Sequence, residues 1–536
     1  EKNLKFWAED GTPQGFGHEL FADDLERIED NMMRAIERVP VVGAAGIKRV
    51  INGPMIWSPD SNVLYGPHPD LRNYFCCNGI IPGFSQSGGM GLMAAQWMIE
   101  GESQYDMFAW DVARFGRWAD AAFTKARVGD QYANRFAIHF PNEERSAGRP
   151  VRVRPAHDLQ VAMGAVMGLN YGWEHPLWFA GEVGTKDTNG FTRQNWFEPV
   201  GDEARMLRTH AGIIDISNFA KYFVQGDGAA DWLDAVFANA MPKLVGRSCL
   251  TPLIGARGGI AGDFTVTKLA DDEFMIIGGG MSERYHSRFW NMVQLPAGTT
   301  FASRTEAMCG FNVAGPKSRD LLNRLTDADL STAAFPFMRS QRIEIAGVPV
   351  IALRVSFTGD LGWELHCDQA DQLRLYEALL EAGKSVGAGP VGSRALMSLR
   401  VEKGYGSWSR EYSPEYWPQE VGLDRLIKLE KDFLNKDAYL RIKDNAPREV
   451  LSLVHVTDVT TADATGGEPI FLTDGTPVGR VTSGTYGYAV EMSLALGYLK
   501  GVAAGTAVDV MILGKPHRGV VLSAPPFDPK GEKLRA

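Results

Sequence analysis

Apolar and polar positions recur with two different periods near the start of the chain. Between residues 22 and 39 the apolar side chains follow a helical spacing, and Pro40 ends the run, which predicts an amphipathic helix. Apolar runs at residues 63–65 and 74–77 lie between turns that contain proline and glycine, and these runs predict two short strands. The apolar face of the predicted helix consists of Leu25, Ile28, Met32, Ile36 and Val39.

Glycines are concentrated in residues 83–91, directly before a segment of helical character at residues 92–100. After the strand at 74–77, this predicts a glycine-rich turn that leads into a helix. Such a turn directs backbone N–H groups and the positive end of a helix toward a ligand. The same pattern is also typical of an ordinary connection between a strand and a helix.

The sequence pattern divides the remaining chain into three parts: a connector, a long region between the connector and about Ala446, which we call the mixed region, and an end that is rich in predicted strands. Residues 109–158 are polar and rich in turn formers, and we interpret them as a connector. From about Ala446 onward, short alternating strands separated by glycine turns predict a compact β-barrel. Because 536 residues are too many for a single core, we expect three or four domains.

The composition of the chain disfavours several classes of binding partner. The net charge of −10 disfavours binding to nucleic acid or to an anionic membrane, and no apolar run is long enough to span a bilayer. Five cysteines are few and odd in number, which indicates free thiols in a reducing compartment. No cysteine or histidine spacing is typical of a metal site, so we expect no metal.

Five motifs follow one another in the mixed region. Their order and spacing resemble those of the aminomethyltransferase, or T-protein, of the glycine cleavage system. One such motif alone is a weak indication, whereas five in order are specific. The motifs occupy residues 209–217, 251–263, 312–319, 356–365 and 392–404.

The segments before these motifs resemble a second kind of protein, and together with the motifs they indicate a more specific family. Asn52-Gly53-Pro54, Ser58-Pro59-Asp60, Tyr65-Gly66-Pro67 and the glycine-rich segment follow one another as near the C-terminal end of flavin amine dehydrogenases. The chain therefore resembles the dimethylglycine and sarcosine dehydrogenase family. The resemblance implies an α+β multidomain fold: a remnant of a flavin amine-oxidoreductase domain, a small middle domain, a T-protein-like folate-binding domain and a C-terminal β-barrel.

The corresponding boundaries place the flavin remnant at residues 1–108, the connector at 109–164, the folate domain at 165–440 and the barrel at 441–536. The family's flavin domain opens with a Gly-x-Gly-x-x-Gly fingerprint after its first strand. This chain has none, because Gly278-Gly279-Gly280 is followed by Glu283 where a third glycine belongs. We therefore expect the chain to be a fragment of a longer protein.

Asp263 is the first candidate for catalysis. It lies in a glycine-containing turn before a predicted strand that includes Thr265, the next implied folate contact. In the family the matching aspartate lies beside the folate nitrogen that accepts the carbon, where a carboxylate orients the amine and takes its proton. Read from local sequence alone, Asp263 is typical of a turn cap. The family often has two adjacent acids here, whereas this chain has Gly262 before Asp263.

Three further residues are implied folate contacts. Glu364 lies between apolar neighbours on a predicted strand, and the matching glutamate accepts hydrogen bonds from the pterin ring; the alternative is an exposed strand residue. Phe357 stands where the family often has tyrosine and is able to stack on the pterin. Arg400, on a predicted helix, matches an arginine that helps to hold folate, or else it forms a structural salt bridge. His366 shares a strand face with Glu364; one interpretation places it in the lining of the site, and the other, which we expect, places it at the surface.

The resemblance implies the C-terminal portion of an enzyme that depends on FAD and tetrahydrofolate. A flavin domain oxidises a small N-methyl amine to an iminium, and the folate domain captures the carbon as 5,10-methylenetetrahydrofolate. A homo-oligomer or an electron-acceptor partner is compatible with this activity. The implied location is the cytoplasm of a bacterium or the mitochondrial matrix of a eukaryote. The implied flavin contacts are Gln86, Ser87, Gly88, Gly89, Met90 and Gly91.

Two alternatives remain open. One is a folate-dependent aminomethyltransferase or demethylase that uses no flavin, and the glycine-rich segment at 83–91 disfavours it. The other is a non-catalytic folate-binding module, which the presence of Asp263 and Glu364 disfavours.

Overall fold

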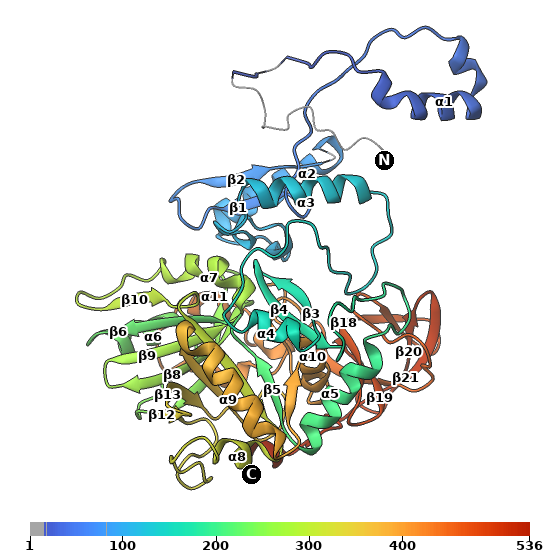
Figure 1. Cartoon of the computed structure of the whole chain (residues 1–536). Coiled ribbons are helices and arrows are strands. Elements are labelled where there is room, and N and C mark those ends of the chain that lie inside the picture. The colour runs from blue at the N-terminus through green and yellow to red at the C-terminus, as the bar shows by residue number, and fades with distance from the viewer. Residues whose placement is uncertain (1–14, 18, 82) are drawn as a thin grey trace.

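In the computed structural model, which describes residues 15–17, 19–81 and 83–536, a five-stranded sheet, a six-stranded sheet and a closed barrel form the body of the molecule (Figure 1). A smaller N-terminal unit lies beside this body. Among the described helices, none combines the length and the apolar character that a membrane span requires.

The five-stranded sheet is antiparallel, in the order β10-β6-β9-β8-β7. Apolar residues alternate along its strands and pack against α6 and α7, so that Trp232, Phe264 and Trp290 share one buried core. The elements are β6 (Ala220–Gln225), α6 (Ala229–Val236), β7 (Ser248–Ile254), β8 (Ile260–Ala270), β9 (Glu273–Gly278), η5 (Gly280–Ser282), α7 (Glu283–Trp290) and β10 (Thr300–Ser303).

The six-stranded sheet has the order β12-β13-β14-β11-β5-β15, and only β15 runs parallel to its neighbour among its paired strands. Helix α9 packs on one face, where Tyr376 stacks on Phe311 with ring centroids 4.9 Å apart. The elements are α5 (Phe197–Thr209), β5 (Gly212–Asp215), β11 (Met308–Ala314), α8 (Ser318–Leu322), β12 (Ser340–Ile345), β13 (Val348–Leu353), β14 (Gly362–Asp368), η6 (Gln369–Asp371), α9 (Gln372–Lys384), β15 (Gly389–Val391) and α10 (Ser393–Glu402).

The predicted C-terminal barrel is confirmed. Its strands close in the order β16-β19-β18-β17-β20-β21. Helix α10 packs against it, and Ser398 Oγ donates to the Tyr486 carbonyl at 2.7 Å. The elements of this end of the chain are η7 (Pro418–Glu420), η8 (Asp424–Leu426), α11 (Lys436–Leu440), β16 (Val450–Val456), β17 (Pro469–Leu472), β18 (Pro477–Gly487), β19 (Met492–Leu499), β20 (Ala507–Ile512), β21 (Lys515–Val521) and η9 (Lys533–Arg535).

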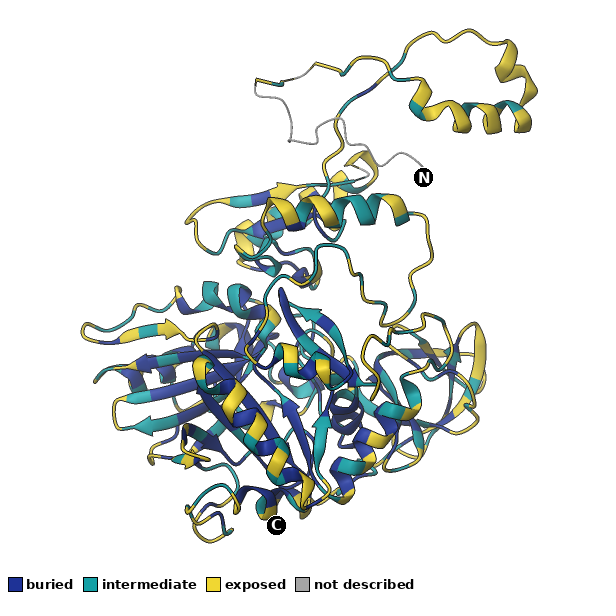
Figure 2. Ribbon diagram, viewed as in Figure 1, coloured by how far each residue is buried: buried dark blue, intermediate teal, exposed yellow. Residues whose placement is uncertain are grey.

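The N-terminal unit contains both predicted strands, which pair as an antiparallel hairpin. The predicted helix at 22–39 is shorter, and its apolar face is largely exposed (Figure 2): Leu25 is 39% and Val39 50% accessible. The elements before the body are η1 (Glu26–Ile28), α1 (Glu29–Arg38), η2 (Pro40–Ala44), β1 (Leu64–Pro67), β2 (Phe75–Asn78), α2 (Gly83–Glu100), η3 (Phe108–Trp110), η4 (Val112–Arg114) and α3 (Ala121–Asn134). The next elements, α4 (His157–Ala162), β3 (Ala165–Asn170) and β4 (Trp173–Phe179), already pack into the body.

The turn predicted at residues 83–91 was wrong. The glycine-rich turn is helical, because α2 begins at Gly83 rather than at Leu92. Tertiary contacts override the low helix propensity of glycine here: Met90 is buried, and its carbonyl accepts a hydrogen bond from the Tyr65 hydroxyl. The connector also contains a regular helix, α3, which Asp120 caps by accepting from the Phe123 N–H at 2.9 Å.

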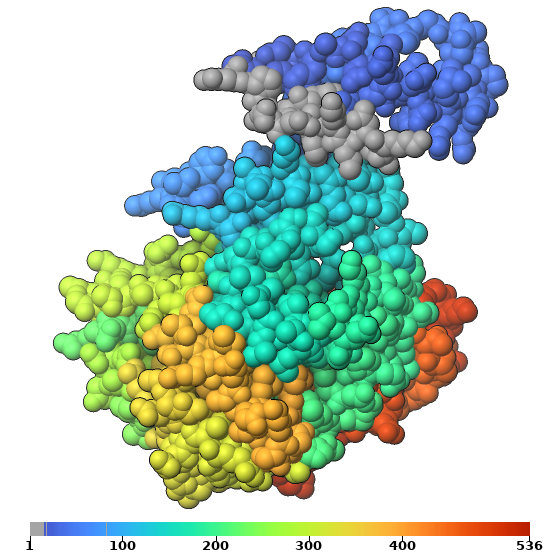
Figure 3. Space-filling view, viewed as in Figure 1, coloured from blue at the N-terminus to red at the C-terminus, as the bar shows by residue number. Residues whose placement is uncertain are grey.

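Ion pairs attach the N-terminal unit to the body, and the space-filling view shows the two parts in contact (Figure 3). Arg288 on α7 pairs with the fully buried Asp111 at 2.5 Å, and Arg284 pairs with Asp70 at 2.6 Å. The ring of Phe108 meets that of Tyr285 edge to face at 5.5 Å. The unit therefore rests on α7, close to the sheet that carries Asp263.

Candidate active site

Asp263 lies within strand β8, opposite Pro252 of β7. Its side chain is half-buried, while the neighbouring Gly262 and Phe264 are buried, as expected where a strand alternates between core and an accessible face. Burial disfavours the charged form and raises the pKa of Asp263 to about 6. The carboxylate is thus a stronger base than an ordinary aspartate and is still mostly ionised at neutral pH.

Steric crowding explains why a glycine occupies the position before Asp263. A Cβ atom added at Gly262 would lie 2.6 Å from the ring of Phe264 and 2.8 Å from His286 Nε2. His286 is buried, and its Nε2 lies 3.0 Å from the Ala261 carbonyl oxygen, which fixes the ring. Burial lowers the pKa of His286 to about 3, so the imidazole is neutral. The second acid that is frequent in the family has no room here.

Contacts between the two sheets link Asp263 to Glu364. Thr265, two residues after Asp263 and half-buried, pairs with Ile277 of β9. Ile277 shares a buried cluster with Leu353 of β13, and Leu353 pairs with Glu364 on β14. The packing of Ile277 against Leu353 therefore joins the two sheets, next to the strand positions of Thr265 and Glu364.

Glu364 is placed where a ligand can reach it. Its side chain is 20% exposed, and it lies opposite Asn312 of β11. His366 Nε2 lies 3.2 Å from one carboxylate oxygen of Glu364. The predicted surface position of His366 was wrong, since its ring is buried. The ring lies against Gly310 of the neighbouring strand β11 and is buried there, whereas the glutamate remains accessible.

Phe357 and Arg400 meet through Tyr405. The rings of Phe357 and Tyr405 stack with centroids 6.3 Å apart and an angle of 18°. Arg400 donates to the Tyr405 carbonyl at 2.7 Å, to Ser483 Oγ at 2.7 Å and to Glu411 Oε2 at 2.9 Å. The guanidinium is fully buried. These contacts form the structural salt bridge that was the alternative to a folate contact for Arg400, and they join α10 to the barrel.

The implied flavin contacts lie apart from these residues, in the N-terminal unit (Figure 1). They occupy helical positions of α2, so the N–H groups beyond its first turn point along the helix and not toward a ligand. A Cβ atom added at Gly88, Gly89 or Gly91 meets nothing within 4 Å. Helix α2 thus leaves open space at these three glycines, between the exposed side chains of Phe84 and Leu92, instead of forming a loop of N–H donors.

Lys221 on β6 is a fully buried lysine that was not among the residues predicted from the sequence. Its Nζ donates to the carbonyls of Ser217 at 3.0 Å and of Phe219 at 2.8 Å. Burial lowers the pKa of Lys221 to about 8, and Glu364 is among the groups that oppose this shift. The sequence does contain a signal for this residue, because a lysine between apolar neighbours on a strand indicates that its side chain is buried.

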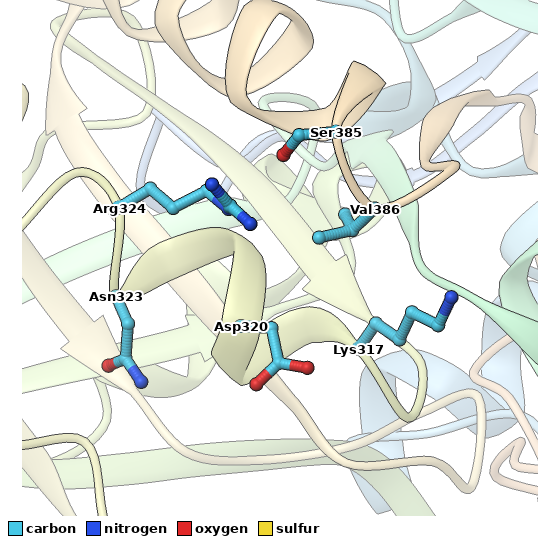
Figure 4. Close-up of a pocket in the computed structure, with 6 residues that line it drawn as sticks. All are labelled: Lys317, Asp320, Asn323, Arg324, Ser385 and Val386. Carbon is cyan, nitrogen blue, oxygen red and sulfur yellow. The ribbon is translucent and has the colours of Figure 1, made fainter.

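Two surface hollows do not coincide with the predicted residues. One lies at the end of α8 and is lined by Lys317, Asp320, Asn323, Arg324, Ser385 and Val386 (Figure 4). The other opens between the edges of the two sheets, and His366 and Phe223 are among its lining residues. Within the described residues, no group of three or more histidine, cysteine, aspartate or glutamate side chains is arranged to hold a metal ion.

Comparisons with known proteins agree with this organisation. The GCVT N-terminal domain matches residues 156–431, the FAD dependent oxidoreductase central domain matches 100–153, and the glycine cleavage T-protein C-terminal barrel domain matches 450–528. The structure of glycine cleavage system aminomethyltransferase T from Bartonella henselae covers 70% of this chain and 98% of its own, with a TM-score of 0.61 and 23% identity. The expected T-protein-like fold is confirmed.

Two curated relatives align over nearly the whole chain. The mitochondrial dimethylglycine dehydrogenase of Mus musculus is 36% identical, covering 97% of this chain and 60% of the relative. The mitochondrial sarcosine dehydrogenase of Mus musculus is 30% identical, covering 100% of this chain and 64% of the relative. The chain thus spans about 60% of the length of these relatives.

Proposed function

The chain belongs to the T-protein (GCVT) family, in the group that contains the dimethylglycine and sarcosine dehydrogenases, and from this premise we propose that it carries the folate half of an N-methyl amine dehydrogenase. A flavin half oxidises the amine to an iminium, and this chain captures the carbon on tetrahydrofolate as 5,10-methylenetetrahydrofolate. The observation that carries the proposal is the half-buried, basic Asp263 within the T-protein region.

Asp263 is the proposed general base. Its carboxylate takes the proton from the folate nitrogen as that nitrogen bonds to the carbon, and its charge offsets the positive charge of the iminium. A pKa of about 6 suits this role, because the base is then largely ionised at neutral pH and still holds a proton well. Thr265 lies on the same strand and borders the proposed binding site.

Glu364 and Phe357 are the proposed contacts of the pterin ring. The accessible carboxylate of Glu364 accepts hydrogen bonds from pterin N–H groups, and the stacked pair of Phe357 and Tyr405 offers an aromatic surface. Arg400 acts as a positioning residue, because its two terminal guanidinium nitrogens donate to Tyr405, Glu411 and Ser483 and it is connected to Phe357 only through Tyr405.

FAD supplies the oxidation of the amine when it is bound in the whole protein. The present residues fit one edge of a flavin site, since the open glycine surface of α2 lets a flat ring approach closely. We therefore retain this surface as the flavin side of the proposal, including Met90, whose side chain anchors the helix in the unit's core. The match to an FAD dependent oxidoreductase central domain favours this function over the flavin-independent alternative.

The finer assignments follow from the same proposal. The substrate is a small N-methyl amine, and a homo-oligomer or an electron acceptor is the expected partner. The location is the mitochondrial matrix in a eukaryote or the cytoplasm in a bacterium. The division at residues 108, 164 and 440 is retained as the proposed domain organisation.

Glu364→Gln tests the proposed binding site. We expect the dissociation constant for tetrahydrofolate to rise roughly 10- to 150-fold, because a charged hydrogen bond contributes about 1.5–3 kcal/mol. The amide also turns a donor toward pterin donors. Fluorescence titration measures the effect, with Glu377→Gln on the exposed side of α9 as the matched control. Equal affinity in the wild type and Glu364→Gln would remove Glu364 from the binding site.

A further inference from the structure

We propose that His366 is a positioning residue that fixes the carboxylate of Glu364 and thereby the pterin end of bound tetrahydrofolate. This inference rests on the proposed function. It assigns a role to a buried histidine that the catalytic scheme itself does not use.

The two side chains share one face of β14. Residues two apart on a strand point to the same side, and the register places His366 opposite Gly310 and Ile351, beside Glu364 opposite Asn312 and Leu353. The imidazole is 1% exposed, and its Nε2 lies 3.2 Å from Glu364 Oε2. One oxygen of the glutamate is therefore held from the interior, while the partly exposed side of the carboxylate remains available to a ligand.

The histidine ring has little freedom to turn. A Cβ atom added at Gly310 would lie 2.8 Å from His366 Nδ1 and 3.3 Å from its Cε1. The Nδ1 and Cε1 atoms of the ring thus lie close to the backbone of β11, in space that a side chain at position 310 would fill. A donor held in this way fixes the direction of its hydrogen bond, which is what a positioning residue requires.

The hydrogen bond also defines the tautomer. A carboxylate only accepts, so Nε2 carries the proton and Nδ1 does not. Nδ1 is buried and has no hydrogen-bond partner among the described residues. Burial lowers the pKa of His366, and the nearby Lys221 ammonium lowers it further, while Glu364 opposes the shift. The imidazole therefore stays neutral and donates a single hydrogen bond.

A neutral donor suits this role better than a cation. An arginine or lysine in contact with Glu364 would compete with the pterin for the carboxylate charge. His366 instead orients the carboxylate without neutralising it. The ammonium of the buried Lys221 is held by two carbonyl groups and makes no hydrogen bond to Glu364 in the described structure, so it leaves the carboxylate to His366 and the ligand.

Two isosteric variants separate positioning from packing. In His366→Gln the side-chain amide N–H group reaches about as far as Nε2, whereas in His366→Asn it ends near the position of Nδ1. We expect His366→Asn to raise the dissociation constant for tetrahydrofolate about tenfold, and His366→Gln to raise it about twofold or less. Thermal melting of both variants reports whether they fold alike.

The decisive comparison is between Glu364→Gln and the double variant Glu364→Gln/His366→Asn. If His366 acts through Glu364, adding His366→Asn to Glu364→Gln changes affinity by less than about twofold. Multiplicative losses in the double variant, or wild-type affinity in His366→Asn while Glu364→Gln binds weakly, would overturn this inference alone. Wild-type affinity in Glu364→Gln would remove Glu364 from the binding site and overturn this inference, whereas no folate binding by the unmodified chain would overturn the proposed function and this inference with it.

Discussion

Asp263→Asn should slow one-carbon transfer to tetrahydrofolate roughly 10²- to 10⁴-fold while the folate remains bound, since this is the usual contribution of general-base assistance. Asparagine keeps the shape of the side chain but has neither the negative charge nor the ability to take a proton. The loss should therefore fall on the chemical step and leave the dissociation constant nearly unchanged.

The pH profile gives this prediction a second readout. Because Asp263 acts as its carboxylate, the transfer rate of the wild type should rise with pH through about 6 and level off above it. In Asp263→Asn this rise should disappear. Single-turnover transfer from an iminium donor or formaldehyde, corrected for the uncatalysed reaction, measures both effects. Asp272→Asn, an exposed acid in the β8–β9 turn, serves as the control. A mutant that keeps the wild-type rate and profile would contradict the assignment.

Arg400→Met should lower the free energy of unfolding by about 3–5 kcal/mol, because it leaves the carboxylate of Glu411 buried without its cation. Glu411 also accepts from Ser483 at 2.5 Å and from Thr482 at 2.8 Å, so the loss falls on the contact between α10 and the barrel. The double variant Arg400→Met/Glu411→Gln should regain part of the stability, since the uncompensated charge is then gone.

Urea denaturation followed by circular dichroism measures this change. Arg374→Met on α9 is the control, because its side chain is 57% exposed and a surface ion pair contributes little. A shift for Arg400→Met as small as that of the control would mean that the buried pair does not hold the barrel in place.

Sequence patterns predicted the strands and the barrel well, because alternation of apolar residues reports directly on which face of a strand is buried. They placed the start of α2 at Leu92 instead of Gly83, since glycine suggests a turn unless tertiary contacts decide otherwise. The burial of Met90 and the hydrogen bond from Tyr65 supply those contacts. Neither is visible in the local sequence.

The proposed site could also be predicted only in part from the local sequence. Asp263 and Glu364 were recognisable because they lie in motifs, whereas the surroundings of Arg400 depend on Glu411 and on Ser483 of the barrel, which are distant along the chain. His366 was assigned to the surface because alternation places it beside Glu364 without revealing which sheet covers it. Long-range packing, not residue type, decides the roles of Arg400 and His366.

The central claim is that this chain binds and uses tetrahydrofolate. Titration of the purified chain with tetrahydrofolate and, separately, with FAD tests it most directly. We expect stoichiometric binding of tetrahydrofolate and weak binding of FAD, because the folate motifs are present whereas the dinucleotide fingerprint does not occur in this sequence. Tight, stoichiometric FAD binding without any binding of tetrahydrofolate would contradict the account.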